Sequence, residues 1–395
     1  MVDGQLSVAQ RLQQRLLEQS KPTLPHSFSW LEQHVLPEPG VEAWKYSPIN
    51  RLYEALLDPQ PSLASAPLET SIQGHDATQD APVSVQIWRR EQQTRIALPE
   101  ALVQTLARAI DADRYPLSHA LGCDLDEVVL IEISGTTQDP LLIEHASVGN
   151  QWVHVRLLAN SNATLTERYL SSASSGITTV ELAAGAQLTH ARSDQNTSAT
   201  SWHLNSANLG SNSTYDLHQV TLGGQMQRID NHIRLLEPGA QASVVGCALC
   251  DQKNRSDLQN VVEHIAPHCE SSQRYHGVAN HSGSLTFGGR IHIHENAQAT
   301  NAHLTNANLV LDDRAQINTK PELEIYNDDV SCSHGATIGR LDADALFYLR
   351  SRGIENKRAQ AMLLKAFVND SIGGPDADTM HHTISEILGK WTTAT

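Results

Sequence analysis

Apolar and polar residues change their spacing twice along the chain, so the sequence divides into three parts. In the first part, Val8, Leu12 and Leu16 fall on one helical face, and Ser7 precedes them as a residue type that caps helices. Helical spacing returns in this part at residues 51–57 and 99–110. We therefore expect an N-terminal helical domain over residues 1–125.

From about Val128 the apolar runs become short and rich in Ile, Val, Thr, Leu and His, with Asn, Gly, Ser and Asp between them. This pattern predicts strands joined by short turns rather than a doubly wound sheet, whose parallel strands need helices between them. A turn built around alanine recurs at residues 161–164, 184–187, 238–241, 295–298, 313–316 and 334–337.

The spacing of these turns predicts a solenoid. Their alanines are 23 residues apart at 163 and 186, 18 apart at 297 and 315, and 21 apart at 315 and 336, which we interpret as single coils. The intervening steps of 54 and 57 residues then correspond to two or three coils, with less regular turns near Asn212 and Cys269. We predict a mainly β protein whose core, over residues 126–340, is a right-handed parallel β-helix. The ends of such a solenoid need covers or partners.

After Gly339 the spacing becomes helical again, and we expect a C-terminal helical domain over residues 341–395. Its apolar residues are interpreted first of all as the core of a small helical bundle. This interpretation covers Leu346, Phe347, Leu349, Met362, Leu363, Leu364 and Phe367.

Composition narrows the classes of function. The chain has 28 Lys and Arg against 44 Asp and Glu, a formal charge of -16, so binding to nucleic acid is not expected. The N-terminus lacks a basic segment followed by an apolar stretch, and no run of 18 apolar residues occurs, so we expect a cytoplasmic protein without a membrane segment. Five cysteines, an odd number in a long chain, indicate reduced thiols rather than a disulfide framework.

Several segments near the end of the predicted β-helix resemble a known family. They read TKPELEIY at 319–326, DDV at 328–330, CSHGATIG at 332–339 and LFYLRSRGI at 346–354, with EAWKYSP at 42–48 and YHGV at 275–278 in agreement. Together they resemble the SufD branch of the SufB/SufD family, most strongly over residues 270–370. The paralogous SufB branch carries a different sequence at the position of CSHG.

The resemblance implies a function. SufD proteins are scaffold subunits of the SufBCD machine that assembles iron–sulfur clusters, so this chain is not expected to be an enzyme. The resemblance implies pairing with a SufB-like paralogue through the two β-helices, and docking of a SufC-like ABC ATPase on the C-terminal helices. The iron–sulfur cluster is expected to be transient and shared with SufB, and no nucleotide is expected on this chain. In isolation, the surface meant for SufB is expected to form a homodimer.

Two donor side chains stand out in the resembling region. Cys332 and His334 are two residues apart, so a strand places both on one face, where a thiolate and an imidazole can bind iron. The resemblance places His334 at the interface with SufB, and Cys332 is the second candidate metal ligand. Two ligands cannot complete a tetrahedral site, so the partner must supply the others. The alternative is a solenoid end at which His334 only hydrogen-bonds a turn.

The resemblance also implies a docking region for the SufC-like ATPase on the first C-terminal helix. It comprises Leu346, Phe347, Tyr348, Arg350 and Arg352. The expected mode of recognition is an apolar helix face that enters a groove on the partner. The two arginines are basic residues in an acidic chain, and either contact with the partner or simple exposure to solvent accounts for them.

Cysteine and histidine spacings elsewhere match metal sites by composition alone. Cys247, Cys250, His264 and His268 have the spacing of a Cys₂His₂ zinc site. Two cysteines three positions apart on one strand face opposite sides, so we interpret this group as core and turn residues.

A second group is rich in histidine. His292 and His294 share one strand face, and His276, His281 and His303 are near them in sequence. We interpret these histidines as structural or surface residues, with transient iron or adventitious metal binding as the alternative.

Two other functions stay open. Parallel β-helices also host carbohydrate-active enzymes, which gather carboxylates in one groove. The acids available for this are Asp312, Asp313, Asp328 and Asp329. A purely structural homodimer is the other alternative. The phosphate-binding Gly-x₄-Gly-Lys-Ser/Thr loop does not occur, so ATP hydrolysis is expected from another subunit.

Overall fold

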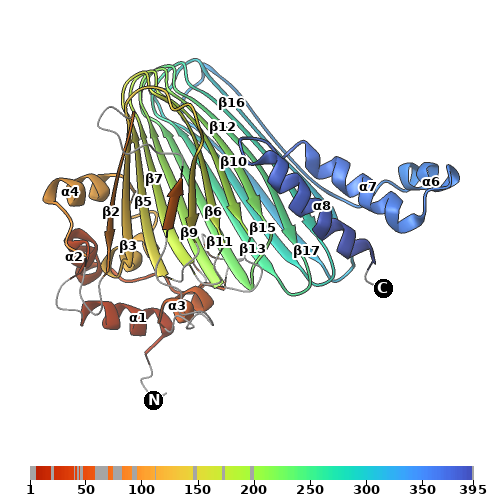
Figure 1. The fold of residues 1–395 in the computed structure, drawn as a ribbon, viewed down its shortest axis with the longest axis horizontal. Helices are drawn as coiled ribbons and strands as arrows, with labels where there is room; N and C mark the ends of the chain where they lie inside the picture. The colour runs from red at the N-terminus through yellow and green to blue at the C-terminus, as the bar shows by residue number, and fades with distance from the viewer. Residues whose placement is uncertain are drawn as a thin grey trace.

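A parallel β-helix forms the centre of the protein, with helices on two sides (Figure 1). The computed structural model describes residues 6–18, 22–39, 41, 44, 48–57, 70–73, 82–90, 96–111, 113–145, 149–170, 174–195 and 200–393. Sheet A contains, in spatial order, β1 (Thr70–Gln73), β4 (Leu141–His145), β6 (Asn162–Tyr169), β8 (Gln187–Asp194), β10 (Thr214–Thr221), β12 (Gln241–Cys250), β14 (Glu270–Ala279), β16 (Thr300–Val310) and β18 (Val330–Gly339). Sheet B contains β2 (Val83–Arg89), β3 (Glu127–Ile133), β5 (Gly149–Leu157), β7 (Ser174–Leu182), β9 (Thr200–Leu209), β11 (Met226–Leu235), β13 (Arg255–His264), β15 (Ser284–Ile293) and β17 (Gln316–Ile325). The predicted β-helix with helical flanks is confirmed.

The turns that enter sheet A from β6 to β16 share one backbone feature, a residue with positive φ. These residues are Asn160, Gly185, Asn212, Gly239, His268 and Ala299, with φ between 52° and 74°. Their backbone N–H groups donate to the neighbouring coil, as from Asn160 to the Ala184 carbonyl at 2.9 Å. At position 185 glycine also avoids a steric overlap, because a Cβ there would overlap the Asn160 side chain. Successive positions, such as 160 and 185 or 268 and 299, are 25 to 31 residues apart, which is the length of one coil.

This coil length corrects the period predicted from the alanine turns. Ala297 precedes β16 in sheet A and Ala315 precedes β17 in sheet B, so the step of 18 residues between them is part of a coil and not a whole one. Residues 334–337 lie inside β18 and are not a turn. The longer steps each span two coils, with the intervening turns at Asn212 and His268. Turns at both edges of a coil use the same small and polar residues, so their spacing alone does not separate a half coil from a coil.

Side chains stack in columns inside the β-helix, one from each coil. One column of sheet A runs through Leu165, His190, Leu217, Val244, Gln273 and Leu304. All six are at most 1% exposed. Burial of each aliphatic member contributes about 1.5–3 kcal/mol to stability, so the columns hold the coils in register. The two polar members show that the interior is not purely apolar.

The N-terminal helices cover the outer face of sheet B (Figure 1). They are α1 (Val8–Leu17), α2 (Pro25–Gln33), α3 (Ile49–Leu57), α4 (Glu100–Arg108) and α5 (Leu117–Cys123). Ser7 caps α1, as predicted, by accepting a hydrogen bond from the backbone N–H of Gln10. Apolar residues of the helices pack around Trp152 and Trp202 of sheet B. The sequence did not predict β1 and β2, which pair antiparallel with β4 and β3 and lie at one end of each sheet.

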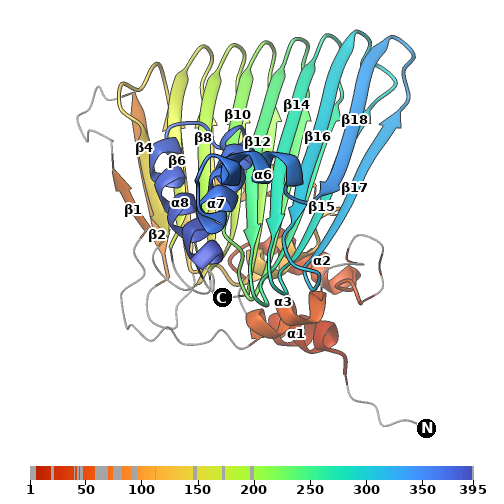
Figure 2. The same cartoon turned by 90° about the vertical axis from the view of Figure 1, so that its right-hand side faces the viewer.

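Three helices follow the β-helix, α6 (Ala343–Ser351), α7 (Asn356–Asn369) and α8 (Ala377–Thr393). Of these, α7 and α8 lie against the outer face of sheet A (Figure 2), and α6 extends beyond α7. Leu364 and Val368 of α7, with Ile384 of α8, pack on Val220 and Leu249 of the sheet. The core of these helices is therefore shared with the β-helix, because the apolar faces of α7 and α8 are buried against each other and against the sheet.

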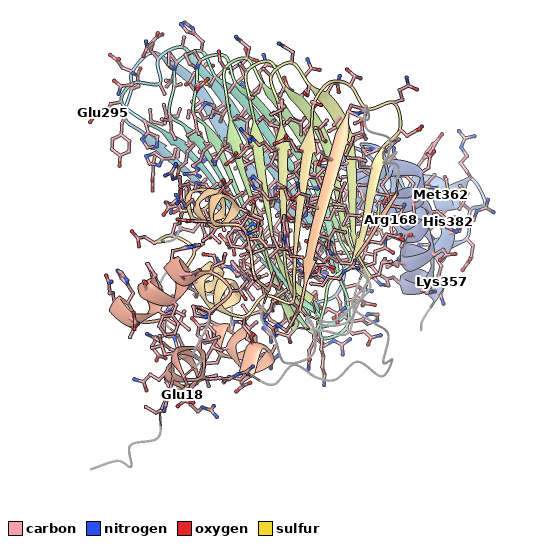
Figure 3. The ribbon with its side chains drawn as sticks, turned by 60° about the vertical axis from the view of Figure 1, so that its left-hand side comes forward. Glu18, Arg168, Glu295, Lys357, Met362 and His382 are labelled. Carbon is pink, nitrogen blue, oxygen red and sulfur yellow. The ribbon has the colours of Figure 1, made fainter. Side chains whose placement is uncertain are left out.

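Polar contacts join these helices to sheet A. Arg168 of β6 pairs with Asp376 at 2.7 Å, and His276 Nδ1 donates to the Phe367 carbonyl at 2.7 Å. In Figure 3, Arg168 lies where the helices meet the β-helix, and Met362 lies on the helices themselves. Among the described residues, no helix combines the length and apolar character needed to cross a membrane.

Candidate functional site

The last coil of the β-helix is uncovered. β17 and β18 are the terminal strands of their sheets, and each pairs on one side only, with β15 and β16. Large apolar residues on this coil are exposed to solvent, with Ile325 at 42%, Ile338 at 50% and Tyr326, just after β17, at 61%. An open strand edge with apolar side chains is a surface on which another chain can add strands.

Cys332 and His334 lie at the open mouth of the β-helix interior. In the register, Cys332 follows Ala302 and His334 follows Leu304, and both of those residues are fully buried in the interior. The two candidate ligands therefore occupy the next positions of two interior columns. Cys332 is half-buried against the core, and His334 is exposed, because no further coil covers them. Both sit on one strand face, as predicted from their spacing.

The Cys332 thiol is more accessible to solvent than the other cysteine side chains. Partial burial raises its pKa, although the backbone N–H of Ala302 counteracts part of the effect. The thiol is therefore protonated at neutral pH until a metal displaces the proton. Cys123, Cys247, Cys250 and Cys269 are buried, so Cys332 is the single cysteine with an accessible side chain.

Two buried asparagines of β16 form hydrogen bonds with the last coil. Asn306 Nδ2 donates to the Tyr275 carbonyl at 3.2 Å, and its Oδ1 accepts from Thr319 Oγ1 of β17 at 2.8 Å. Asn308 Nδ2 donates to the Thr337 carbonyl of β18 at 3.0 Å. These contacts join both terminal strands to the preceding coil. The sequence carries a signal for this pair, because Asn306 and Asn308 are spaced by two between apolar residues, but the predictions above do not include them.

The first C-terminal helix is almost unpartnered. No residue of α6 is buried, and Phe347 and Tyr348 are 71% and 56% exposed. Met362 of α7 is also exposed, so the interpretation of Phe347 and Met362 as bundle core is wrong. The cause is geometric, because α7 and α8 bury their apolar faces on the sheet and leave α6 outside.

Among the other residues of the expected docking region, Leu346 is half-buried, and Arg350 and Arg352 are exposed. The Arg352 guanidinium lies 5.2 Å from the centre of the Tyr348 ring. The helix starts at Asp342, whose side chain accepts from the backbone N–H of Asp344 at 2.8 Å. An exposed, capped helix with two aromatic side chains is suited to contact with another protein.

Comparison with known proteins agrees with these features. Residues 142–367, more than half of the chain, match the family model described as SUF system FeS cluster assembly, SufBD core domain. The chain belongs to the SufBD family. It is 29% identical over 387 residues to the iron–sulfur cluster assembly protein SufD of Escherichia coli, covering 91% of this chain and 86% of that protein.

Two other relatives match shorter parts of the chain. A SufBD family protein of Synechocystis is 35% identical over 196 residues, which is 49% of this chain and 43% of the relative. The SufB protein of Bacillus subtilis is 28% identical over 130 residues, 33% of this chain and 28% of that protein. The resemblance to the SufD branch is thus confirmed over most of the chain. Of the segments that carried it, 42–48 lies mostly outside the described residues.

The four residues whose spacing matches a zinc site do not come together in the structure. Cys247 lies in the cluster between sheet A and the C-terminal helices, whereas Cys250 faces the interior of the β-helix. Burial raises the pKa of these thiols to about 12 and about 11. His264 hydrogen-bonds Ser271 at 2.8 Å. His268 is exposed in the turn before β14, where its φ is 59°. The interpretation as core and turn residues is confirmed.

The histidines near His292 take separate places. The His276 ring contacts α7, His281 Nδ1 lies 2.6 Å from Asp251 Oδ1, and His303 Nδ1 lies 2.7 Å from Ser333 Oγ. His292 and His294 stack with their ring centres 4.2 Å apart. These two are the part of the group that stays together.

The four acids considered for a carbohydrate-active enzyme lie apart. Asp312 and Asp313 precede β17, and Asp328 and Asp329 follow it. A strand of ten residues separates the pairs by about 33 Å. They do not form the shared groove that this chemistry requires.

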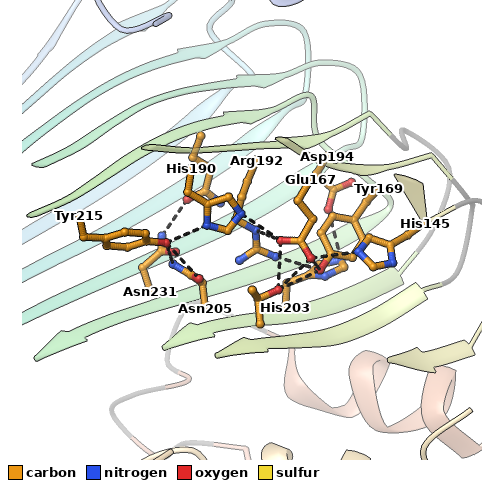
Figure 4. A network of polar contacts seen from close by, with 12 residues as sticks. His145, Glu167, Tyr169, His190, Arg192, Asp194, His203, Asn205, Tyr215 and Asn231 are labelled. Carbon is orange, nitrogen blue, oxygen red and sulfur yellow. Dashed lines mark hydrogen bonds and ion pairs between the residues drawn. The ribbon is translucent and has the colours of Figure 1, made fainter. Parts of the chain in front are cut away.

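A charged network that the sequence did not predict lies inside the β-helix (Figure 4). Glu167 is fully buried and lies 3.0 Å from Arg192 Nε, with the His145 ring at 2.9 Å. Burial alone would raise the pKa of Glu167, but the Arg192 charge and contacts with His145 and His190 outweigh it and hold the pKa well below the usual range. The carboxylate therefore stays ionised in the core. Apart from Tyr169 on the same strand, its partners come from other strands, so sequence spacing carries little signal for the network.

Proposed function

We propose that the chain is a non-catalytic scaffold subunit of a SufBCD-type machine, and that its last coil pairs with a SufB-like paralogue. The observation that carries this proposal is the open mouth of the β-helix, where Cys332 and His334 continue two interior columns without a covering coil. A second β-helix adding strands at β17 and β18 would bury Ile325 and Ile338 and enclose the two donors. The isolated chain forms a homodimer through the same edge.

The iron–sulfur cluster is the cargo of this interface and is held only transiently. Cys332 and His334 supply one thiolate and one imidazole, and iron in a tetrahedral site takes four ligands, so the SufB-like partner and sulfide provide the remainder. Cluster binding releases the proton of the Cys332 thiol, because only the thiolate ligates metal. His334 is the primary ligand on this chain, and Cys332 is the secondary one.

A SufC-like ABC ATPase docks on α6 in this proposal. Phe347 and Tyr348 provide an exposed aromatic pair, and Met362 extends the apolar surface onto α7. An apolar helix face of this kind fits a hydrophobic groove on a partner. ATP hydrolysis by that partner would move α6 and rearrange the last coil, since β18 leads into α6 through only a short segment.

The test of the cluster interface is anaerobic cluster assembly on the complex of this chain with its SufB-like and SufC-like partners. We expect His334→Ala to abolish cluster formation without loss of the complex, and Cys332→Ser to reduce it. His303→Ala is the matched control, because His303 lies on the neighbouring strand next to Ser333 but on the opposite face. Unchanged cluster content with His334→Ala would refute the proposed site.

Thiol labelling tests the pairing independently of cluster chemistry. At a dilution that dissociates the proposed homodimer, a soluble maleimide is expected to label one cysteine of the folded chain, Cys332, because the other four are buried. The SufB-like partner should protect this thiol. Phe347→Asp should release the ATPase while leaving that protection intact, and equal labelling with and without the SufB-like partner would contradict the assigned interface.

A further inference from the structure

Three side chains with the chemistry of metal ligands meet on the outer face of sheet B, next to the terminal strand β17. They are Glu263, near the end of β13, His292 of β15 and His294, the residue directly after β15. One ligand atom from each lies within 4.8 Å of the others. Glu263 and His292 are cross-strand neighbours in the register, and the backbone N–H of His294 continues the ladder by donating to the His264 carbonyl at 2.9 Å. The backbone therefore fixes the relative positions of all three.

The carboxylate of Glu263 is oriented by partners outside the group. Its Oε1 accepts from Arg114 Nη1 at 2.7 Å, and His232 Nε2 lies 3.1 Å from the same oxygen. Its other oxygen, Oε2, is directed toward His294 Nε2 at 3.7 Å. Arg114 comes from the segment between α4 and α5, so the docking of the N-terminal helices on sheet B sets the orientation of this carboxylate. Contacts of this kind orient the ligands of protein metal sites.

An unsatisfied nitrogen points into the group. The His294 side chain is 38% exposed as a whole, yet its Nε2 atom is enclosed and has no hydrogen-bond partner among the described residues. At 3.7 Å, the distance to Glu263 Oε2 is too long for a hydrogen bond and leaves space between the two atoms. A buried polar atom without a partner carries a free-energy cost that a bound cation would remove.

We propose that Glu263, His292 and His294 bind a divalent transition metal of the zinc or ferrous class. Two imidazole nitrogens and one carboxylate oxygen, with further positions left to water, are the donor set of known Zn²⁺ and Fe²⁺ sites. A metal about 2.0–2.1 Å from each tetrahedral ligand places the ligands about 3.4 Å apart, so the side chains close by roughly 1 Å on binding. Glu324 Oε2, at 3.9 Å from His292 Nδ1, is within reach as a further acceptor. The site does not depend on the proposed cluster interface.

Titration of the full-length, metal-free protein with Co²⁺ tests the proposal through the ligand-field absorption of bound cobalt. All variants are made in a Cys332→Ser, His334→Ala background, so the mouth of the β-helix contributes no ligands. We expect one Co²⁺ per chain, and Zn²⁺ should displace it. His292→Ala and His294→Ala should each weaken binding by more than about a hundredfold, because even the loss of outer-shell partners costs about 10–100-fold.

The matched control is His382→Ala. His382 lies 3.3 Å from Glu386 on α8, and both side chains are well exposed, so this pair reports adventitious binding to a surface histidine and carboxylate. It should leave the affinity unchanged. Thermal unfolding with and without Zn²⁺ gives a second readout, in which Zn²⁺ raises the unfolding temperature of the background protein but not of the His294→Ala variant. The proposal would be overturned if the background protein bound no stoichiometric Co²⁺, or if the His292→Ala and His294→Ala variants bound it as tightly as the background protein does.

Discussion

The substitution Glu167→Gln should destabilise the protein strongly, although it replaces one residue by another of almost equal size. Glu167 is fully buried, and its carboxylate accepts from Arg192 Nε at 3.0 Å and from Thr178 Oγ1 at 2.9 Å. Glutamine keeps the volume and one acceptor oxygen, so no cavity forms. It removes the charge that compensates Arg192, which is itself only 4% exposed.

The size of the effect follows from this unpaired cation. Removal of one partner of a buried ion pair typically costs about 3–5 kcal/mol, because the remaining charge stays in a medium of low polarity. The Tyr169 hydroxyl, which accepts from Arg192 Nη2 at 3.1 Å, offsets a small part. We therefore expect a loss of about 3–4 kcal/mol in the free energy of unfolding. The contribution is fully present at neutral pH, because the pKa of Glu167 in the folded protein is depressed, and it is lost only as the pH falls below about 4.5 and through that depressed value.

Urea unfolding at pH 7.5, followed by the circular dichroism of the β-helix, measures this loss. Glu132→Gln is the control. It removes the same charge from an ion pair with Arg156 at 3.3 Å whose side chains are 42% and 52% exposed, so we expect a loss below about 1 kcal/mol. If the two variants lost equal stability, or if Glu167→Gln lost less than about 1 kcal/mol, the assignment of an ionised pair in the core would be wrong.

Two further predictions concern the β-helix. Burial lowers the pKa of His264 to about 4. As the pH falls below 6.5, this residue therefore binds a proton in the unfolded chain but not in the folded chain. The free energy of unfolding is expected to drop by up to about 3 kcal/mol near pH 4 from this residue. His264→Gln should reduce the slope of this dependence by about one proton, because His119 and His154, whose pKa burial also lowers to about 4, keep their contributions. Unfolding free energies between pH 7.5 and 4.5 measure the slope, and an unchanged slope would show that His264 does not contribute to it. Gly246→Ala should cost about 1–3 kcal/mol, because the added Cβ overlaps the Tyr275 ring, whereas Gly335→Ala, with open space around it, should change the urea midpoint little. Equal midpoints for the two variants would contradict this packing.

Local patterns in the sequence determined the kinds of element and much of their placement. The helix start at Ser7 followed from a capping residue and a 3.6-residue apolar period, which act over a few residues. Short β-branched runs separated by turn residues indicated a β-helix, because each coil depends on its neighbours for burial. The common face of Cys332 and His334 followed from strand geometry. Their assignment to a cluster interface depends on family resemblance and stays a prediction.

The tertiary structure decided what depends on register between coils. The true coil length was hidden because turns at the two sheet edges are chemically alike. The pairing of β1 and β2 with β4 and β3 joins segments far apart in sequence and leaves no local signal. The Glu167 network and the group of Glu263, His292 and His294 exist because particular coils stack in particular registers. The packing of side chains in the interior columns sets those registers, and this packing depends on residues of different coils that meet only in the folded protein.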